Sequence, residues 1–334
     1  MMQVFDDTKR CYPCGIGGAI IMLFLLSMFL MPDGADAATT ISPKHKAFVS
    51  PEEGANAMIA AMEMNDTKSL TAIFGPAGKE LIFSRDPNVD KERRETFVMS
   101  YQEKNRFERI GDTIAILYTG KDDWPFPIPL VKNAQGWHFD TKAGKEEILN
   151  RIIGRNELSA VQVCLAYVDA QREYALGDHD RDGFFEYAQK FVSDPGKKNG
   201  LYWETREDEK PSPLGPAIAM ATREGYKKMP KDFLAIGSPL PYHGYFYKIL
   251  KAQGKNTPGG AYDYIANGKM IGGFALVAYP AEYGSSGIMT FIVHMDGIVY
   301  DKNLGKNSAK IAETLKQFDP DKTWKIVAYG HAVK

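Results

Sequence analysis

Alternating carboxylates between residues 178 and 186 form the group whose types and spacing most clearly suggest chemistry. Asp178, Asp180 and Asp182 occupy positions 1, 3 and 5 of a loop, and Gly183 occupies position 6. In calcium-binding loops this alternation turns the carboxylates inward, and the glycine permits a sharp turn. The candidate calcium ligands are Asp178, Asp180, Asp182, Phe184 at position 7 (through its backbone) and Glu186 at position 9.

The same loop has a second interpretation that needs no ion. Position 12 is Gln189, where a bidentate Glu is expected in a calcium loop. Asp182 could instead cap a helix that begins at Phe184, within a solvated turn. A capping carboxylate can lie beside an ion, so both interpretations stay open, and calcium is the one candidate cofactor.

Other chemistry-bearing residues give weaker signals, and no catalytic residue can be assigned. Cys164 lies among apolar residues, which favours a buried, inert thiol. Residues 284–287 lack the G-x-S-x-G pattern, and residues 254–260 lack the order of a phosphate-binding loop. The histidines form neither HExxH nor a close pair, so zinc is not expected; they are His45, His138, His179, His243, His294 and His331.

The elements that would position the acidic loop lie on both sides of it. A helical stripe over 156–176 precedes the loop, and a short helix is expected to follow it as far as residue 192. Residues 194–216 are rich in Pro, Gly and charge, which is typical of a surface excursion. Strands are expected over 242–252, 271–279 and 288–295, the last pairing with 298–300 across an Asp296-Gly297 turn. A helix near 308–318 and a strand at 324–329 follow. About half of the many tyrosines and phenylalanines here must face the core.

The preceding part of the chain reads as helices followed by strands. Ser50, Pro51 and Glu53 form a helix start with a capping box. Further helices are expected over 65–73 and 90–101, then strands at 114–118 and 137–140, with the proline-rich stretch 124–129 as an edge. A helix over 142–153 is expected to end at Gly154.

These patterns predict an α+β protein in which each half packs helices on an antiparallel sheet. The expected divisions are 1–37, 38–154 and 155–334. The order of elements in 38–154 resembles the cone-shaped nuclear transport factor/ketosteroid isomerase superfamily. The half 155–334 resembles the globular part of type II pseudopilins, in which a long helix leads through a DxDxDG-like loop to a sheet. It departs from them because its helix begins in mid-chain at Asn156.

Residues 1–37 have the three parts of a secretory signal peptide. Lys9 and Arg10 precede an apolar run over 16–31, and Ala35-Asp36-Ala37 follows it. Cleavage after Ala37 or Ala38 would give a periplasmic or secreted protein. The alternative is that the segment is not cleaved and anchors the protein, which would then contact the membrane only through this segment. Cleavage also removes Cys11 and Cys14, leaving one Cys and no intramolecular disulfide.

The charge balance bears on partners. The chain has Lys+Arg 41 and Asp+Glu 42, for a net charge of -1. Nucleic-acid binding needs a basic patch or stripe, so no nucleic-acid partner is expected.

Several glycine- and tyrosine-rich segments carry a family resemblance. Residues 244–254, 268–280, 284–287, 296–297 and 301–305 resemble the bacterial family catalogued as domain of unknown function 2950. The resemblance implies an exported envelope protein and no particular activity. The leading hypothesis is a non-enzymatic role in binding or assembly, with an envelope protein or a small ligand as partner. The alternatives are a hydrolase or isomerase with a pocket in residues 48–153, and a pilin-like structural component.

Overall fold

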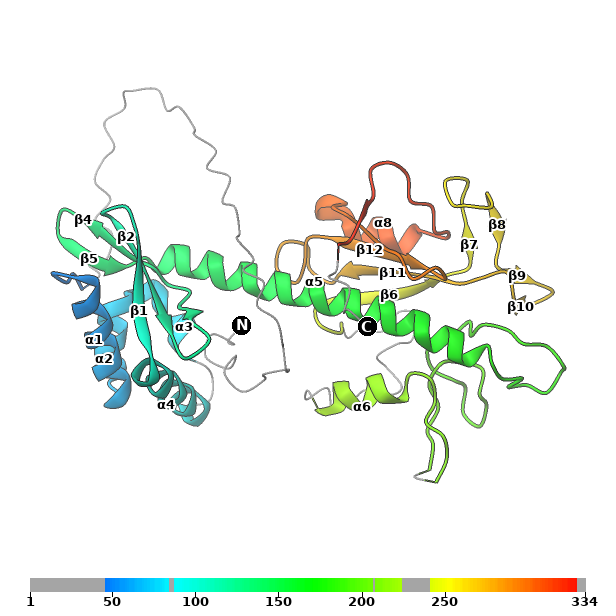
Figure 1. Cartoon of the computed structure of the whole chain (residues 1–334), viewed down its shortest axis with the longest axis horizontal. Helices are drawn as coiled ribbons and strands as arrows, with labels where there is room; N and C mark the ends of the chain where they lie inside the picture. Colours follow the sequence, from blue (N-terminus) through cyan, green and yellow to red (C-terminus); the bar gives the residue numbers. More distant parts are fainter. Residues whose placement is uncertain (1–45, 84–86, 207, 224–240, 329–334) are drawn as a thin grey trace. The chain divides into compact units, whose positions relative to one another are not determined.

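The computed structural model describes residues 46–83, 87–206, 208–223 and 241–328 (Figure 1). The expected signal segment 1–37 lies outside these ranges. Within them, no helix is both long enough and apolar enough to cross a membrane. The chain forms two compact units, Met1–Leu149 and Asn150–Lys334.

The first unit packs short helices against an antiparallel sheet. Its helices are α1 (Pro51–Glu63), α2 (Thr67–Phe74), α3 (Lys79–Ile82) and α4 (Pro87–Glu103), with the 3-10 turn η1 (Pro76–Gly78). The strands are β1 (Asn105–Ile110), β2 (Ile114–Thr119), β3 (Trp124–Pro125), β4 (Leu130–Asn133) and β5 (Gly136–Phe139), in the order β1-β2-β4-β5 with β3 paired to β2. The buried rings of Phe74, Phe97, Phe126 and Phe139 join the helices to this sheet.

Local signals account for the start of this unit. The Ser50 hydroxyl accepts a hydrogen bond from the Glu53 amide at 3.1 Å, which confirms the predicted helix cap. The Glu53 carboxylate accepts from the Val49 amide at 2.7 Å, one residue before the position expected of a capping box. Asp66 caps α2 in the same manner.

The second unit is built on a five-stranded antiparallel sheet. Its strand order is β14 (Lys325–Ile326), β13 (Val299–Lys302), β12 (Thr290–His294), β11 (Ala275–Pro280), β6 (Tyr245–Leu250). Two small ribbons flank it, β7 (Ala252–Gln253) with β8 (Tyr262–Asp263), and β9 (Ile265–Ala266) with β10 (Lys269–Met270). It is completed by α6 (Gly215–Arg223), α8 (Ser308–Thr314), the turn η2 (Gly305–Asn307) and the part of α5 (Thr141–Tyr174) from Asn150 onward. The α+β class predicted from the sequence is confirmed.

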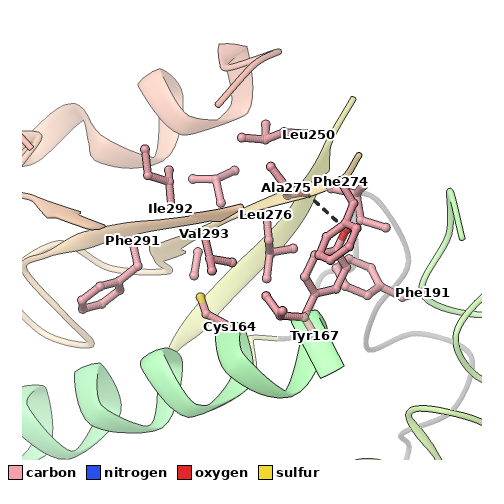
Figure 2. Packing of buried hydrophobic residues seen from close by; sticks show 14 of the residues in the cluster. Cys164, Tyr167, Phe191, Leu250, Phe274, Ala275, Leu276, Phe291, Ile292 and Val293 are labelled. Carbon is pink, nitrogen blue, oxygen red and sulfur yellow. Dashed lines mark hydrogen bonds between the residues drawn. The ribbon is translucent and has the colours of Figure 1, made fainter. Parts of the chain in front are cut away.

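The core of the second unit lies between α5 and the sheet. Cys164 and Tyr167 project from α5 toward Leu276 and Val293 of the central strands, and all four are fully buried or nearly so (Figure 2). Every residue of β11 and β12 is buried, because α8 covers the opposite face (Figure 2). A fully apolar run such as 275–280 is what two covered faces require.

The β12–β13 hairpin forms as predicted, with a longer turn. Pairing ends at Val293 and Val299, and the Gly297 amide donates to the His294 carbonyl at 2.9 Å. Gly297 alone of the two expected turn residues takes a positive φ, +83°.

The structure corrects three expectations. First, α5 runs unbroken through Gly154, where the sequence predicted a helix end. An added Cβ at Gly154 would meet no atom, so the glycine serves no packing purpose. A glycine inside a helix costs about 1 kcal/mol, which two strongly helical flanks can outweigh.

Second, the helix predicted to run from Phe184 to residue 192 does not form. The main chain there forms isolated β-bridges instead, from Tyr187 to Met270 and from Val192 to Tyr202. Third, the stretch 194–216 is only partly a surface excursion, because Leu201 and Leu214 are buried in the core of the second unit.

Candidate functional site

The acidic loop follows directly on the C-terminal end of α5. The Asp178 carboxylate accepts hydrogen bonds from the amides of Arg181 (2.8 Å), Asp182 (3.2 Å) and Gly183 (2.9 Å). Arg181 and Gly183 have φ of +63° and +87°, which curls the backbone around that carboxylate. The bond from the Gly183 amide, with those from the other two amides, holds the pKa of Asp178 below its ordinary value.

Three of the predicted ligands converge. Carboxylate oxygens of Asp178, Asp180 and Asp182 all lie within 4.8 Å of one another. The Lys269 ammonium group lies against them, 3.3 Å from Asp180 and in direct contact with Asp182. Its hydrogen bond to Asp182 lowers the pKa of that carboxyl and raises the pKa of Lys269. Lys269 is thus an internal counter-ion that sequence spacing could not reveal, because it lies 87 residues beyond Asp182 in the chain.

The other predicted residues have different positions. Glu186 does not belong to the converging group, and burial raises its pKa although Lys269 acts in the opposite direction. The Phe184 amide donates to Asp182 at 3.0 Å, and its exposed ring lies 5.5 Å from the Lys269 nitrogen. Gln189 donates to the Gly268 carbonyl at 2.7 Å instead of facing the loop.

The capped-helix interpretation of Asp182 is therefore wrong. No helix begins at Phe184. The hydrogen bond from the Phe184 amide to the Asp182 side chain closes a local turn, since Asp side chains commonly accept from the amide two residues further on. The main chain after the loop is instead tied to α5 by the buried side chain of Gln171. Its amide group donates to the Ala188 carbonyl and accepts from the Ala188 amide, both at 2.8 Å.

A cavity of about 360 Å³ adjoins the loop, and we call it the α5-end cavity. It lies in the second unit, between the last turn of α5, the start of the acidic loop and the stretch 198–213. Its lining residues are Glu173, Leu176, Gly177, His179, Lys198, Trp203, Glu209, Lys210, Pro211 and Pro213. The sequence did not lead us to expect a cavity here. The signal that could have indicated one is the presence of Leu201, Trp203 and Leu214 in a stretch that is otherwise rich in charge and proline.

The remaining candidate residues take structural places. Cys164 is buried as predicted, and burial raises the pKa of its thiol. His294 is buried and stacks on Phe318 with 5.0 Å between ring centroids. Tyr245 and Tyr264 are wholly buried in the core, whereas Tyr262 is exposed.

Comparison with known proteins places the chain in one family. A search of curated proteins and a search of solved structures gave no match. The family model described as protein of unknown function (DUF2950) matches residues 45–327, most of the chain. The chain therefore belongs to the DUF2950 family, the one its segments 244–254 and 268–280 resemble.

Proposed function

We propose that the protein is an exported envelope protein that acts by binding or assembly and whose acidic loop takes up a calcium ion. The observation that carries the calcium proposal is the convergence of the Asp178, Asp180 and Asp182 carboxylates within 4.8 Å. Calcium prefers six to eight oxygen ligands drawn from carboxylates, carbonyls and water. Export is proposed from the apolar run 16–31 and the Ala35-Asp36-Ala37 sequence.

Lys269 sets the expected strength of the calcium site. Its ammonium group already neutralises part of the negative charge of Asp180 and Asp182. A divalent ion must displace this tethered cation, and the Glu expected at position 12 is missing. Both points favour weak binding, in the range of about 10⁻⁴–10⁻³ M that extracellular calcium modules show.

Calorimetric titration of the mature chain, residues 38–334, with calcium tests the site. We expect measurable heat, weaker binding by Asp182→Asn and tighter binding by Lys269→Met, which removes the competing cation. Asp169→Asn is the matched control, since Asp169 is an exposed carboxylate on α5 outside the loop. Absence of heat at millimolar calcium in both the wild type and Lys269→Met would refute the calcium proposal.

Export is tested separately. Expression in a bacterium followed by fractionation should recover the protein outside the cytoplasm, with a new N-terminus at Ala38 or Thr39. Retention of the intact chain in the cytoplasmic fraction would contradict the proposal.

A pilin-like structural role is the second candidate. It is favoured by the packing of α5 along the sheet and by strand β14 at the sheet edge, where Ile326 is 63% exposed. An exposed edge strand offers unpaired backbone groups to a partner strand. The test compares partners captured from envelope extract by the wild type, Ile326→Lys and Ile271→Lys, whose isoleucine is exposed elsewhere. A partner lost only with Ile326→Lys supports this role, and an unchanged set of partners contradicts it.

A further inference from the structure

The α5-end cavity has the size of a small-molecule site. Its volume of about 360 Å³ lies within the range of roughly 300–1,000 Å³ typical of ligand pockets. It is formed by residues far apart in the chain, from Glu173 on α5 to Pro213.

One wall of the cavity is aromatic and held in place. The His179 ring stacks on Tyr174 with 4.1 Å between centroids, and its Nε2 lies 2.9 Å from the Tyr174 carbonyl oxygen. Trp203 lies 5.4 Å from the His179 ring and 6.5 Å from Tyr174. His179 and Trp203 are half-buried, so each ring has a supported side and keeps some exposed surface. Such rings pack against the apolar face of a ligand ring at little cost in ordering.

The charges that line the cavity are mostly paired. Lys210 pairs with Glu173 at 2.8 Å, and Glu209 pairs with Arg206 at 3.0 Å. Lys198 is different: its ammonium group lies 5.3 Å from the centre of the Trp203 ring, and no carboxylate pairs with it in the part of the chain that the structure describes. The lining therefore presents one cation without a counter-ion beside the aromatic wall.

We propose that the α5-end cavity binds a small monocarboxylate whose ring offers an apolar face to aromatic side chains. The carboxylate pairs with Lys198, and the ring packs against Trp203 and His179. A single negative charge matches the single uncompensated cation, whereas a dianion would leave charge unpaired. Both an aromatic acid and a sugar acid have this chemistry. This ligand site goes beyond the proposed calcium site and does not depend on it.

The indole groups give a readout specific to this site. The chain has 4 Trp, so the mature protein labelled with ¹⁵N-tryptophan gives four indole signals, and the loss of one in Trp203→Phe assigns Trp203. Phenylacetate tests the aromatic acid, glucuronate the sugar acid, and phenylacetamide and methyl glucoside are their neutral counterparts. Calcium is removed with a chelator throughout, so that the outcome is independent of the acidic loop.

We expect the Trp203 signal to shift with at least one of the two carboxylates at millimolar concentration and with neither neutral compound. Lys198→Gln should weaken that binding by about tenfold or more, as loss of a charged hydrogen bond does. Lys197→Gln is the matched control, since Lys197 is exposed and does not line the cavity. The proposal is overturned if neither carboxylate moves the signal, if a neutral counterpart binds as well as its acid, or if Lys198→Gln binds like the wild type.

Discussion

The stretch of α5 from Cys164 to Gln171 and the C-terminal end of this helix face very different surroundings. In that stretch, Cys164, Tyr167 and Gln171 are almost completely buried. The Tyr167 hydroxyl donates to the Ala275 carbonyl at 3.3 Å (Figure 2), and it accepts from Gln171 at 3.0 Å. One turn later the helix ends among carboxylates, lysines and a cavity.

This difference separates what holds the second unit together from what is available to bind. The polar groups of Tyr167 and Gln171 have partners inside the protein, so their loss is expected to lower stability. Most charged groups at the end of the helix pair with one another at the surface, where ion pairs contribute little to folding. The candidate sites accordingly lie at the end, and the following variants test that separation.

The largest effect is expected in the core. Phe274 is fully buried and packs edge-on against Tyr167, with 5.7 Å between ring centroids. Phe274→Ala should lower the free energy of unfolding of the second unit by about 3–5 kcal/mol in urea denaturation. Leu158→Ala, on α5 but 71% exposed, should change it by less than about 0.5 kcal/mol. Similar losses in both variants would break the comparison.

Gln171 should come next, because it marks the boundary between the two regions. Gln171→Ala leaves the buried amide and carbonyl of Ala188 without their partners. Each buried unsatisfied group costs about 1–3 kcal/mol. Gln162→Ala, at an exposed glutamine of the same helix, is the control. If the two variants unfold at the same urea concentration, Gln171 does not tie the chain after the loop to α5.

Asp301 on β13 is expected to lower the stability of the second unit slightly at neutral pH. One of its carboxylate oxygens is buried without a hydrogen bond, and burial raises its pKa although Lys325 opposes the shift. A carboxyl whose pKa is raised in the folded state stabilises the fold at pH values below its ordinary pKa of 3.8. That stabilisation is lost as the pH rises through the pKa of the folded state. Asp301→Asn should therefore melt higher than the wild type at pH 7, with the difference shrinking in acid. The exposed Asp263→Asn should show no such trend.

The smallest effect is expected at the cavity. Lys210 is 80% exposed in its ion pair with Glu173, so Lys210→Gln should change the free energy of unfolding by less than about 1 kcal/mol. Urea denaturation of Lys210→Gln and Gln171→Ala under the same conditions compares the two losses of free energy of unfolding directly. A loss as large as that of Gln171→Ala would mean that the cavity charges support the fold.

Local signals were sufficient where neighbouring residues decide the structure. Ser50 and Glu53 fix the start of α1 through bonds spanning three and four residues. Alternating apolar residues predicted β2, and the Asp296-Gly297 pair predicted the hairpin that joins β12 to β13.

Prediction failed where distant parts of the chain compete with local preference. The residues after Gly183 could have formed a helix, but the Tyr187 amide donates to the Met270 carbonyl instead, and Val192 forms a parallel bridge with Tyr202. The carboxylate spacing found the three converging aspartates, yet Lys269 reaches them only through the β9–β10 ribbon. The α5-end cavity likewise depends on how 198–213 folds back, which no short-range pattern encodes.

The burial of Cys164 turns that residue into a built-in reporter of unfolding. A thiol reagent attacks the ionised sulfur, and in the folded second unit this sulfur is shielded from solvent and its ionisation is suppressed. It is the single thiol of residues 38–334, so in that part of the chain the rate of its modification measures how often the layer between α5 and the sheet opens. A cysteine introduced at an exposed position such as Leu158 would react at once. The slower reaction of Cys164 in the same molecule would then report how often the core opens.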